Sequence, residues 1–167
     1  FIQFWVNAPA ANKMAAPYYQ PISLEDTPLV EEEKSKIWVV SGKFKDTKGA
    51  APTYSPQLLL RGELAKGGSV SIPITASFNA LVYVLEGSIK TGGGQLLTKD
   101  MGVYHLDGES IELHATADTR YILLSGEPIG EPVAQYGPFV MNNQTQVMEA
   151  VRDAQIGKMG VLIEEFE

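Results

Sequence analysis

Apolar and polar residues alternate along the middle of the chain in short segments that are bounded by residues favouring turns. These segments are rich in Val, Ile, Leu and Tyr, are separated by Gly, Asp and Ser, and lie near residues 56–64, 69–75, 79–88, 101–106, 110–115 and 119–126. A spacing of about ten residues between such strands is typical of β-sandwiches and small barrels. The pattern therefore predicts an all-β fold.

One stretch near the end of the chain has helical periodicity instead, over residues 143–156. Asn143 and Gln146 are spaced to cap its start, and Gly157 can end it. One face of the helix carries apolar residues at i, i+3, i+4 and i+7, namely Val147, Ala150, Val151 and Ala154. We therefore expect a β-barrel followed by a single α-helix.

Composition narrows the possible functions. The 167 residues include no Cys, which excludes a disulfide framework, a Cys-ligated metal and a thiol nucleophile. The net charge is −7 and Lys and Arg form no cluster, so we expect no direct nucleic-acid binding. No apolar run reaches the roughly 20 residues of a membrane span, so we expect no membrane insertion and a cytoplasmic location.

The acidic run Glu31–Glu33 is interpreted as a solvated loop, with a docking site for a basic partner as the alternative. Trp38 and Tyr83 lie within strand patterns and are expected in the core. The chain begins without Met at Phe1, inside an apolar segment, so we expect further residues in front of it.

The segment from Ala80 to Gly87 resembles the strand of a metal-binding cupin, which begins with a metal-binding Glu and ends in a Gly turn. On this resemblance the metal-ligand positions hold Pro73, Thr75, Ala80 and Ile111 instead of three His and one Glu. First-row metals in such sites require imidazole or carboxylate ligands. We therefore predict no metal, no cofactor and a dry barrel centre. Strand alternation is expected to turn the following side chains inward: Ser71, Pro73, Thr75, Ala80, Val82 and Val84.

The two histidines, His105 and His114, fall outside these ligand positions. We interpret them as ordinary strand residues, because nothing marks a nucleophile beside either one. Acidic pairs such as Glu109 and Glu112 are interpreted as surface residues. The sequence therefore predicts no catalytic residue.

Two terminal segments resemble a named family, the pirins. Residues 4–10 (FWVNAPA) and 13–20 resemble the segment that joins the two halves of pirins, and residues 137–142 (GPFVMN) with 157–160 (GKMG) resemble the pirin C-terminal signature. The resemblance implies a two-cupin protein of about twice this length, with iron in the N-terminal half and no metal in the C-terminal half. It also implies quercetin 2,3-dioxygenase activity or a role in transcription for the whole protein.

This resemblance predicts that the chain is the metal-free C-terminal half and that its main partner is its own N-terminal cupin. Residues 1–55 would be the inter-domain strand and loops that pack on the barrel, 56–127 the degenerate cupin barrel, and 128–167 a C-terminal loop, helix and tail, all in one structural domain. Trp5, Tyr18 and Tyr19 are candidates for the inter-domain contact, or else cover one open end of the barrel. An exposed docking face would favour a homodimer or another protein partner. The alternatives are a stand-alone oxygenase cupin and a barrel that binds a small molecule without catalysis.

Overall fold

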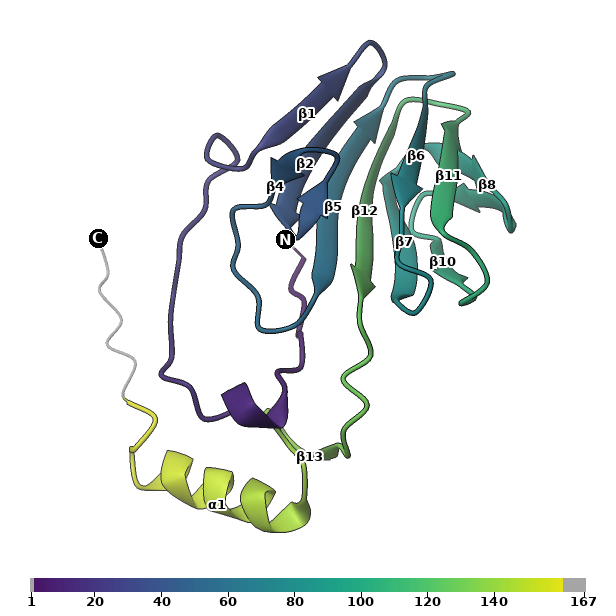
Figure 1. The fold of residues 1–167 in the computed structure, drawn as a ribbon. Coiled ribbons are helices and arrows are strands. Elements are labelled where there is room, and N and C mark those ends of the chain that lie inside the picture. The colour runs from purple at the N-terminus through teal and green to yellow at the C-terminus, as the bar shows by residue number, and fades with distance from the viewer. Residues whose placement is uncertain (1, 161–167) are drawn as a thin grey trace. The chain divides into compact units, whose positions relative to one another are not determined.

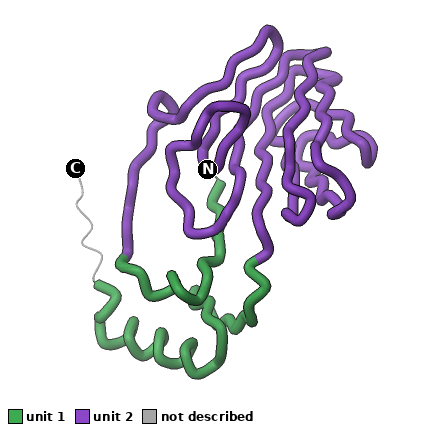
Figure 2. The backbone as a smooth tube through the Cα atoms, in the orientation of Figure 1, with its two compact units in different colours: residues 1–16, 129–167 green, residues 17–128 purple. Residues whose placement is uncertain are grey.

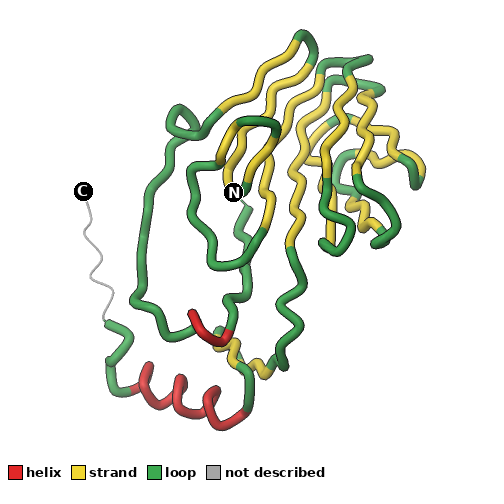
Figure 3. Tube along the Cα trace, viewed as in Figure 1, coloured by secondary structure: helices red, strands yellow, loops and turns green. Residues whose placement is uncertain are grey.

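The structure is a computed structural model that describes residues 2–160, and strands dominate this range (Figure 1; Figure 3). The chain divides into two compact units, which are coloured separately in Figure 2. One unit spans Pro17–Pro128, and the other combines the described residues up to Ala16 with those from Ile129 onward. No helix in the described range is long and apolar enough to cross a membrane.

The larger unit is a sandwich of two antiparallel sheets. The first sheet has six strands in the order β1-β2-β5-β12-β7-β10, which are Leu29–Glu32, Ser35–Ser41, Gln57–Leu64, Thr119–Gly126, Asn79–Glu86 and Met101–Tyr104. The second has the order β6-β11-β8-β9, which are Ser69–Pro73, Ser110–Ala115, Ser88–Thr91 and Gly94–Leu97. A small hairpin, β3 (Lys43–Phe44) and β4 (Thr47–Lys48), stands apart from both sheets in the pairing.

The hydrophobic core fills the space between the two sheets. The register aligns one fully buried residue from each of four neighbouring strands, Val39, Leu60, Leu123 and Val82. Ile72, Leu113 and Ile89 of the second sheet belong to the same cluster and are equally buried. Each strand alternates buried and accessible side chains, as expected when one face of a sheet covers a core and the other does not.

The predicted all-β fold is confirmed, and each of the six predicted strands is present within a few residues of its expected bounds. The sheet begins earlier in the chain than expected, however. The sequence placed the start of the barrel at residue 56, whereas β1 and β2 already belong to the six-stranded sheet. Residues 2–9, part of the expected inter-domain strand and loops, contain neither helix nor strand.

Trp38 and Tyr83 lie on the outer face of the six-stranded sheet and are only half-buried, so their expected place in the core was wrong. They occupy strand positions of the opposite phase to the core residues. Trp38 lies directly across from Arg61, whose guanidinium sits 4.7 Å from the centre of the indole ring. This is cation–π distance, so the ring is partly covered by a charged side chain rather than by the core.

A glycine makes room for the largest buried side chain. Tyr121 of β12 is fully buried and lies directly across from Gly62 of β5. A Cβ atom at Gly62 would approach Cζ of Tyr121 to 2.1 Å, so only glycine allows the ring to lie over this strand. The Tyr121 ring therefore lies over the backbone of β5 at Gly62 instead of packing beside a side chain of that strand.

The smaller unit contains a short 3-10 helix, Ala10–Asn12, the hairpin of β13 (Ala134–Tyr136) and β14 (Phe139–Met141), and helix α1 (Gln144–Gln155). The prediction of one C-terminal helix is confirmed, with the expected caps. The Asn143 side chain accepts a hydrogen bond from the backbone N–H of Gln146 at 2.9 Å. At the other end, Gly157 has a φ of +77°, and Lys158 N–H donates to the carbonyl of Asp153 in a Schellman arrangement.

Candidate functional site

The positions that the cupin resemblance assigns to metal ligands do not share one environment. Ala80 and Ile111 are buried, with 6% and 4% of their surface exposed, and both belong to the core. Pro73 and Thr75 are exposed instead. In the register of β6 and β11, Ile111 lies across from Ile72, whereas Pro73 lies across from the exposed Ser110. The interior position in this strand is therefore Ile72.

The expected phase of strand β6 was wrong by one residue. Ser71 and Pro73 point to the outer face, where Ser71 hydrogen-bonds to Glu112, while Val70 and Ile72 enter the core. The expected phase of β7 was correct, because Ala80, Val82 and Val84 are all buried. The two strands differ in phase because β6 ends at Pro73 and the alternation does not continue through the turn to Asn79, where β7 begins.

The chemistry of the interior does not fit a metal. The inward positions near the expected site hold mostly aliphatic side chains and the hydroxyl of Ser125, none of which offers the imidazole or carboxylate that a first-row metal requires. Within residues 2–160, no three His, Asp or Glu side chains gather closely enough to hold an ion. His105 and His114 are both exposed and are not brought to the interior. No metal-dependent step can be derived from this arrangement.

A pocket of about 640 Å³ lies in the larger unit, beside the end of the core that contains Ala80. Its walls include Leu58, Ile74 and Phe78, and the hairpin residues Lys43 and Lys48 contribute charge. Ser125 of β12 also lines the pocket and is buried, with 6% of its surface exposed. The register places Ser125 directly across from Ala80, the position assigned to the lost Glu ligand. Sequence reasoning missed these polar residues because it followed only the cupin motif positions.

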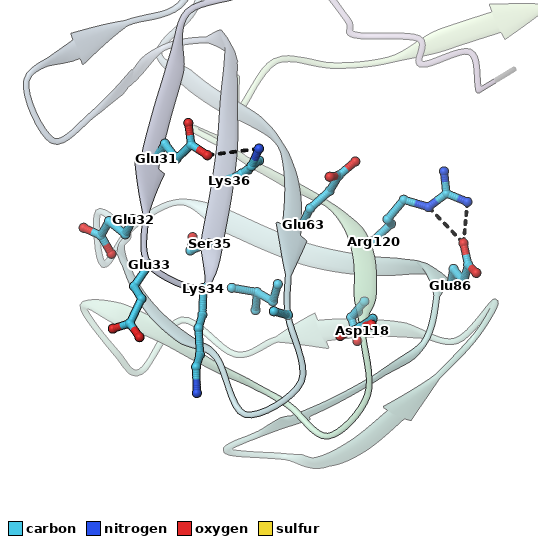
Figure 4. A pocket seen from close by; sticks show the side chains of 13 residues that line it. Glu31, Glu32, Glu33, Lys34, Ser35, Lys36, Glu63, Glu86, Asp118 and Arg120 are labelled. Atoms are coloured by element: carbon cyan, nitrogen blue, oxygen red, sulfur yellow. Dashed lines mark hydrogen bonds and ion pairs between the residues drawn. The ribbon is translucent and has the colours of Figure 1, made fainter.

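A second pocket, of about 410 Å³, is rich in charged side chains and is shown in Figure 4. Glu31 reaches Lys36 at 3.0 Å there, and Arg120 donates through Nε to Glu86 at 2.9 Å. The bond to Glu31 raises the pKa of Lys36. Because the paired side chains are about half exposed, these ion pairs belong to a solvated surface and form no catalytic set.

The acidic run from Glu31 to Glu33 falls at this second pocket. Its residues are exposed, at the end of β1 and the turn that follows it, so the interpretation as a solvated segment agrees with their position. Glu31 pairs with Lys36 and Glu32 pairs with Lys45. These pairings offset much of the negative charge that would attract a basic partner.

The aromatic candidates for an interface are strongly exposed. Trp5 has 65% of its surface exposed, Tyr18 has 75% and Tyr19 has 86%. Tyr18 and Tyr19 belong to the same unit as the sandwich, and their exposure disagrees with the alternative that they cover an end of the barrel. Exposed aromatic residues of this size are the type that anchors protein interfaces.

Comparisons with known proteins agree on one family. The model of the pirin C-terminal cupin domain matches residues 59–160. A pirin-like protein of Arabidopsis thaliana is 34% identical over 161 residues, which cover 91% of this chain and 52% of that protein. Pirin of Mus musculus is 31% identical over 95% of this chain and 57% of its own length.

A solved structure extends the comparison to three dimensions. The quercetin 2,3-dioxygenase of Acinetobacter baumannii superposes with a TM-score of 0.88 at 36% identity, over 95% of this chain and 56% of that one. The chain thus spans about half the length of the relatives that it matches. The sequence resemblance and the two-sheet fold are both confirmed, and the chain belongs to the pirin family.

Proposed function

We propose that this chain acts as a metal-free C-terminal cupin that packs against a metal-binding N-terminal cupin and supports the site in that partner. The observation that carries the proposal is the match of residues 59–160 to a C-terminal cupin domain, in relatives of nearly twice the length. The inward positions of the sandwich support it further, because their aliphatic side chains and the Ser125 hydroxyl offer neither imidazole nor carboxylate. Its role would be structural, and iron would belong to the partner half.

The whole protein would then be a quercetin 2,3-dioxygenase or a redox-linked regulator with a further protein partner. The first activity is the one named for the Acinetobacter baumannii relative, which is 36% identical to this chain. Such chemistry requires a metal and its ligands, and we assign both to the N-terminal cupin. The cytoplasmic location stays a prediction.

We place the face that would receive the N-terminal cupin at one edge of the six-stranded sheet. Strand β10 ends this sheet, and its Met101 and Val103 have 57% and 70% of their surface exposed. They lie across from Tyr83 and Leu81, which are half-buried on the same outer face. An exposed apolar edge strand is a common site of association between chains. We assign this edge to the N-terminal cupin.

Metal analysis tests the functional assignment. The purified chain is incubated with Fe(II), freed of loose metal and analysed for bound iron, with the Acinetobacter baumannii protein treated in parallel. We expect far less than one equivalent in this chain and no turnover of quercetin. Stoichiometric iron together with quercetin turnover would show that the chain is an oxygenase in its own right.

Sedimentation tests the docking face. Without its partner, the chain is expected to self-associate through the β10 edge, and the double variant Met101→Lys/Val103→Lys is expected to sediment as a monomer. Tyr54→Lys replaces another exposed apolar residue, with 60% of its surface exposed, and serves as the control that keeps the association. A wild-type chain that stays monomeric at high concentration would contradict this assignment.

A further inference from the structure

The pocket of about 640 Å³ has the properties of a ligand site that the structural role does not require. Its volume lies within the range of small-molecule sites, which combine apolar walls with a few well-placed polar groups. Leu58, Pro73, Ile74 and Phe78 supply the apolar wall. All of its lining residues belong to the unit that spans Pro17–Pro128. The pocket therefore depends on one unit alone.

The charge at this pocket is opposite to that of the chain. The chain has 20 acidic residues and 13 Lys and Arg, yet the pocket lining contains two lysines and no Asp or Glu. Lys43 and Lys48 lie directly across from each other in the β3–β4 hairpin. Within residues 2–160, no carboxylate lies within 4.0 Å of either ammonium group. Like charges directly opposite each other are destabilising, and a bound anion would remove that cost.

The hairpin holds the two lysines in a fixed place. Between them, Phe44 enters the core and has only 2% of its surface exposed. The backbone of Gly49 donates to the carbonyl of Gly42 at 2.8 Å, and a Cβ atom at Gly42 would meet the carbonyl oxygen of Gln57 at 2.1 Å. The hairpin thus packs too closely on β5 to move freely. The backbone positions of the two lysines are therefore fixed, while their exposed side chains can turn toward a ligand.

A buried hydroxyl is the third polar group of the pocket. Ser125 Oγ has no hydrogen-bond partner among the described residues, although Ser125 is 6% exposed. A buried hydroxyl without a partner is destabilising, so such groups are uncommon in folded proteins. Neighbouring core residues offer no donor or acceptor, because Ser125 lies between Leu58 and Ala80 in the register. The Oγ atom itself has no contact with solvent, so the hydroxyl is enclosed by the protein beside the pocket.

We propose that this pocket binds a small apolar molecule with a carboxylate at one end, such as an aromatic or alicyclic acid. The carboxylate pairs with Lys43 and Lys48, and the ring packs on Ile74 and Phe78. The proposal rests on the pocket and not on docking to an N-terminal cupin, so each can fail without the other.

Titrations followed by NMR and calorimetry test the proposal on the 167-residue chain. The probes are benzoate, cyclohexanecarboxylate and 2-naphthoate, with 2-naphthalenemethanol as the uncharged match for the last. We expect saturable shifts at Ile74 and Ser125 with at least one acid below about 10 mM, the range of weak small-ligand binding. The alcohol is expected to bind about tenfold more weakly than 2-naphthoate, because two exposed ion pairs together contribute about 1.4 kcal/mol.

Matched variants separate the pocket from the general surface. Lys43→Gln/Lys48→Gln is expected to weaken binding of the acid about tenfold and leave the alcohol unchanged, since only the charge pairing is lost. Lys66→Gln/Lys90→Gln removes the same charge at exposed positions outside the pocket and is expected to change neither. Thr75→Trp fills the pocket from an exposed position and is expected to abolish binding of every probe without unfolding the chain.

Three results would overturn the proposal. One is the absence of saturable shifts at the pocket for all three acids up to about 10 mM. Another is equal loss of acid binding in both double lysine variants, which would mark a non-specific charge effect. The third is full binding in Thr75→Trp, which would place the probes elsewhere. None of these results bears on iron content or on sedimentation, so they leave the proposed structural role untouched.

Discussion

Replacement of Tyr121 by Phe should stabilise this protein, although it deletes a polar group from the centre of the fold. The Tyr121 side chain is fully buried, and its hydroxyl has no hydrogen-bond partner among the described residues. An unsatisfied buried hydroxyl costs about 1–3 kcal/mol, whereas the space left by one oxygen atom costs less than a deleted methyl group. We expect the free energy of unfolding to rise by about 1 kcal/mol, which corresponds to roughly 2–4 °C in the melting temperature.

Tyr104 provides the matched control for this substitution. Its hydroxyl is hydrogen-bonded to Thr91 Oγ1 at 2.9 Å, so Tyr104→Phe removes a formed bond rather than an orphaned group. We expect this variant to lose about 1 kcal/mol of stability, opposite in sign to the Tyr121 variant. Urea unfolding at pH 8, followed by the loss of β-structure in circular dichroism, measures both.

The stability difference between Tyr121→Phe and the wild type should also depend on pH in the alkaline range. Burial raises the pKa of Tyr121 well above its usual value of about 10, so the folded chain keeps the phenol neutral while the unfolded chain ionises. The contribution of Tyr121 to stability is therefore fully present below pH 10 and falls above it by about 1.4 kcal/mol per pH unit. The advantage of Tyr121→Phe should widen from about 1 kcal/mol at pH 8 to about 2.5 kcal/mol at pH 11.

Unfolding curves of the wild type and the variant at both pH values test this reasoning. A variant that is less stable than the wild type at pH 8, with a difference that stays constant up to pH 11, would refute it. Such a result would mean that the hydroxyl has a partner in the folded state and that the phenol is not desolvated.

Two further predictions concern residues whose type is required by the local backbone, namely Gly62 in β5 and the helix cap Asn143. Gly62→Ala should destabilise the chain by about 1–3 kcal/mol or more, because the added Cβ overlaps the Tyr121 ring. Gly93→Ala, in the open β8–β9 turn, should have little effect and serves as the control. Urea unfolding compares the two variants, and equal stabilities would contradict the close packing of Tyr121 on Gly62. Asn143→Ala should lower the stability of helix α1 by about 1 kcal/mol, because it deletes the N-cap hydrogen bond to Gln146. Thermal loss of the helical circular dichroism signal measures this effect. An equal loss in Gln144→Ala, at an exposed position of the same helix, would show that the cap is not responsible.

The strand pattern could be predicted from the sequence because it depends on local alternation of apolar and polar residues. The helix was equally accessible, since Asn143 and Gly157 act on their own neighbours. The end segments also carried enough family-specific residues to indicate a pirin before any comparison. These features share one property, which is that residues close in the chain determine them.

Most of the candidate pocket was hidden from sequence reasoning because its parts come from distant segments. Lys43 and Lys48 contribute from a short hairpin, Phe78 from a turn and Ser125 from β12. Ser125 in particular carries no motif, and only strand pairing places it across from Ala80. The cupin resemblance does point to Pro73 and Thr75, which are exposed and belong to the lining of this pocket.

The sequence by itself determined the all-β class, the single capped helix and the family, because each follows from local pattern or from contiguous motifs. Only the tertiary structure decided which strand face enters the core. A side chain in a strand changes face with a shift of one residue, and the pairing of Ile111 with Ile72 sets that phase. The β3–β4 hairpin and the pairing of β12 with its neighbours likewise bring two lysines, the buried Ser125 and an apolar wall together at one end of the sandwich.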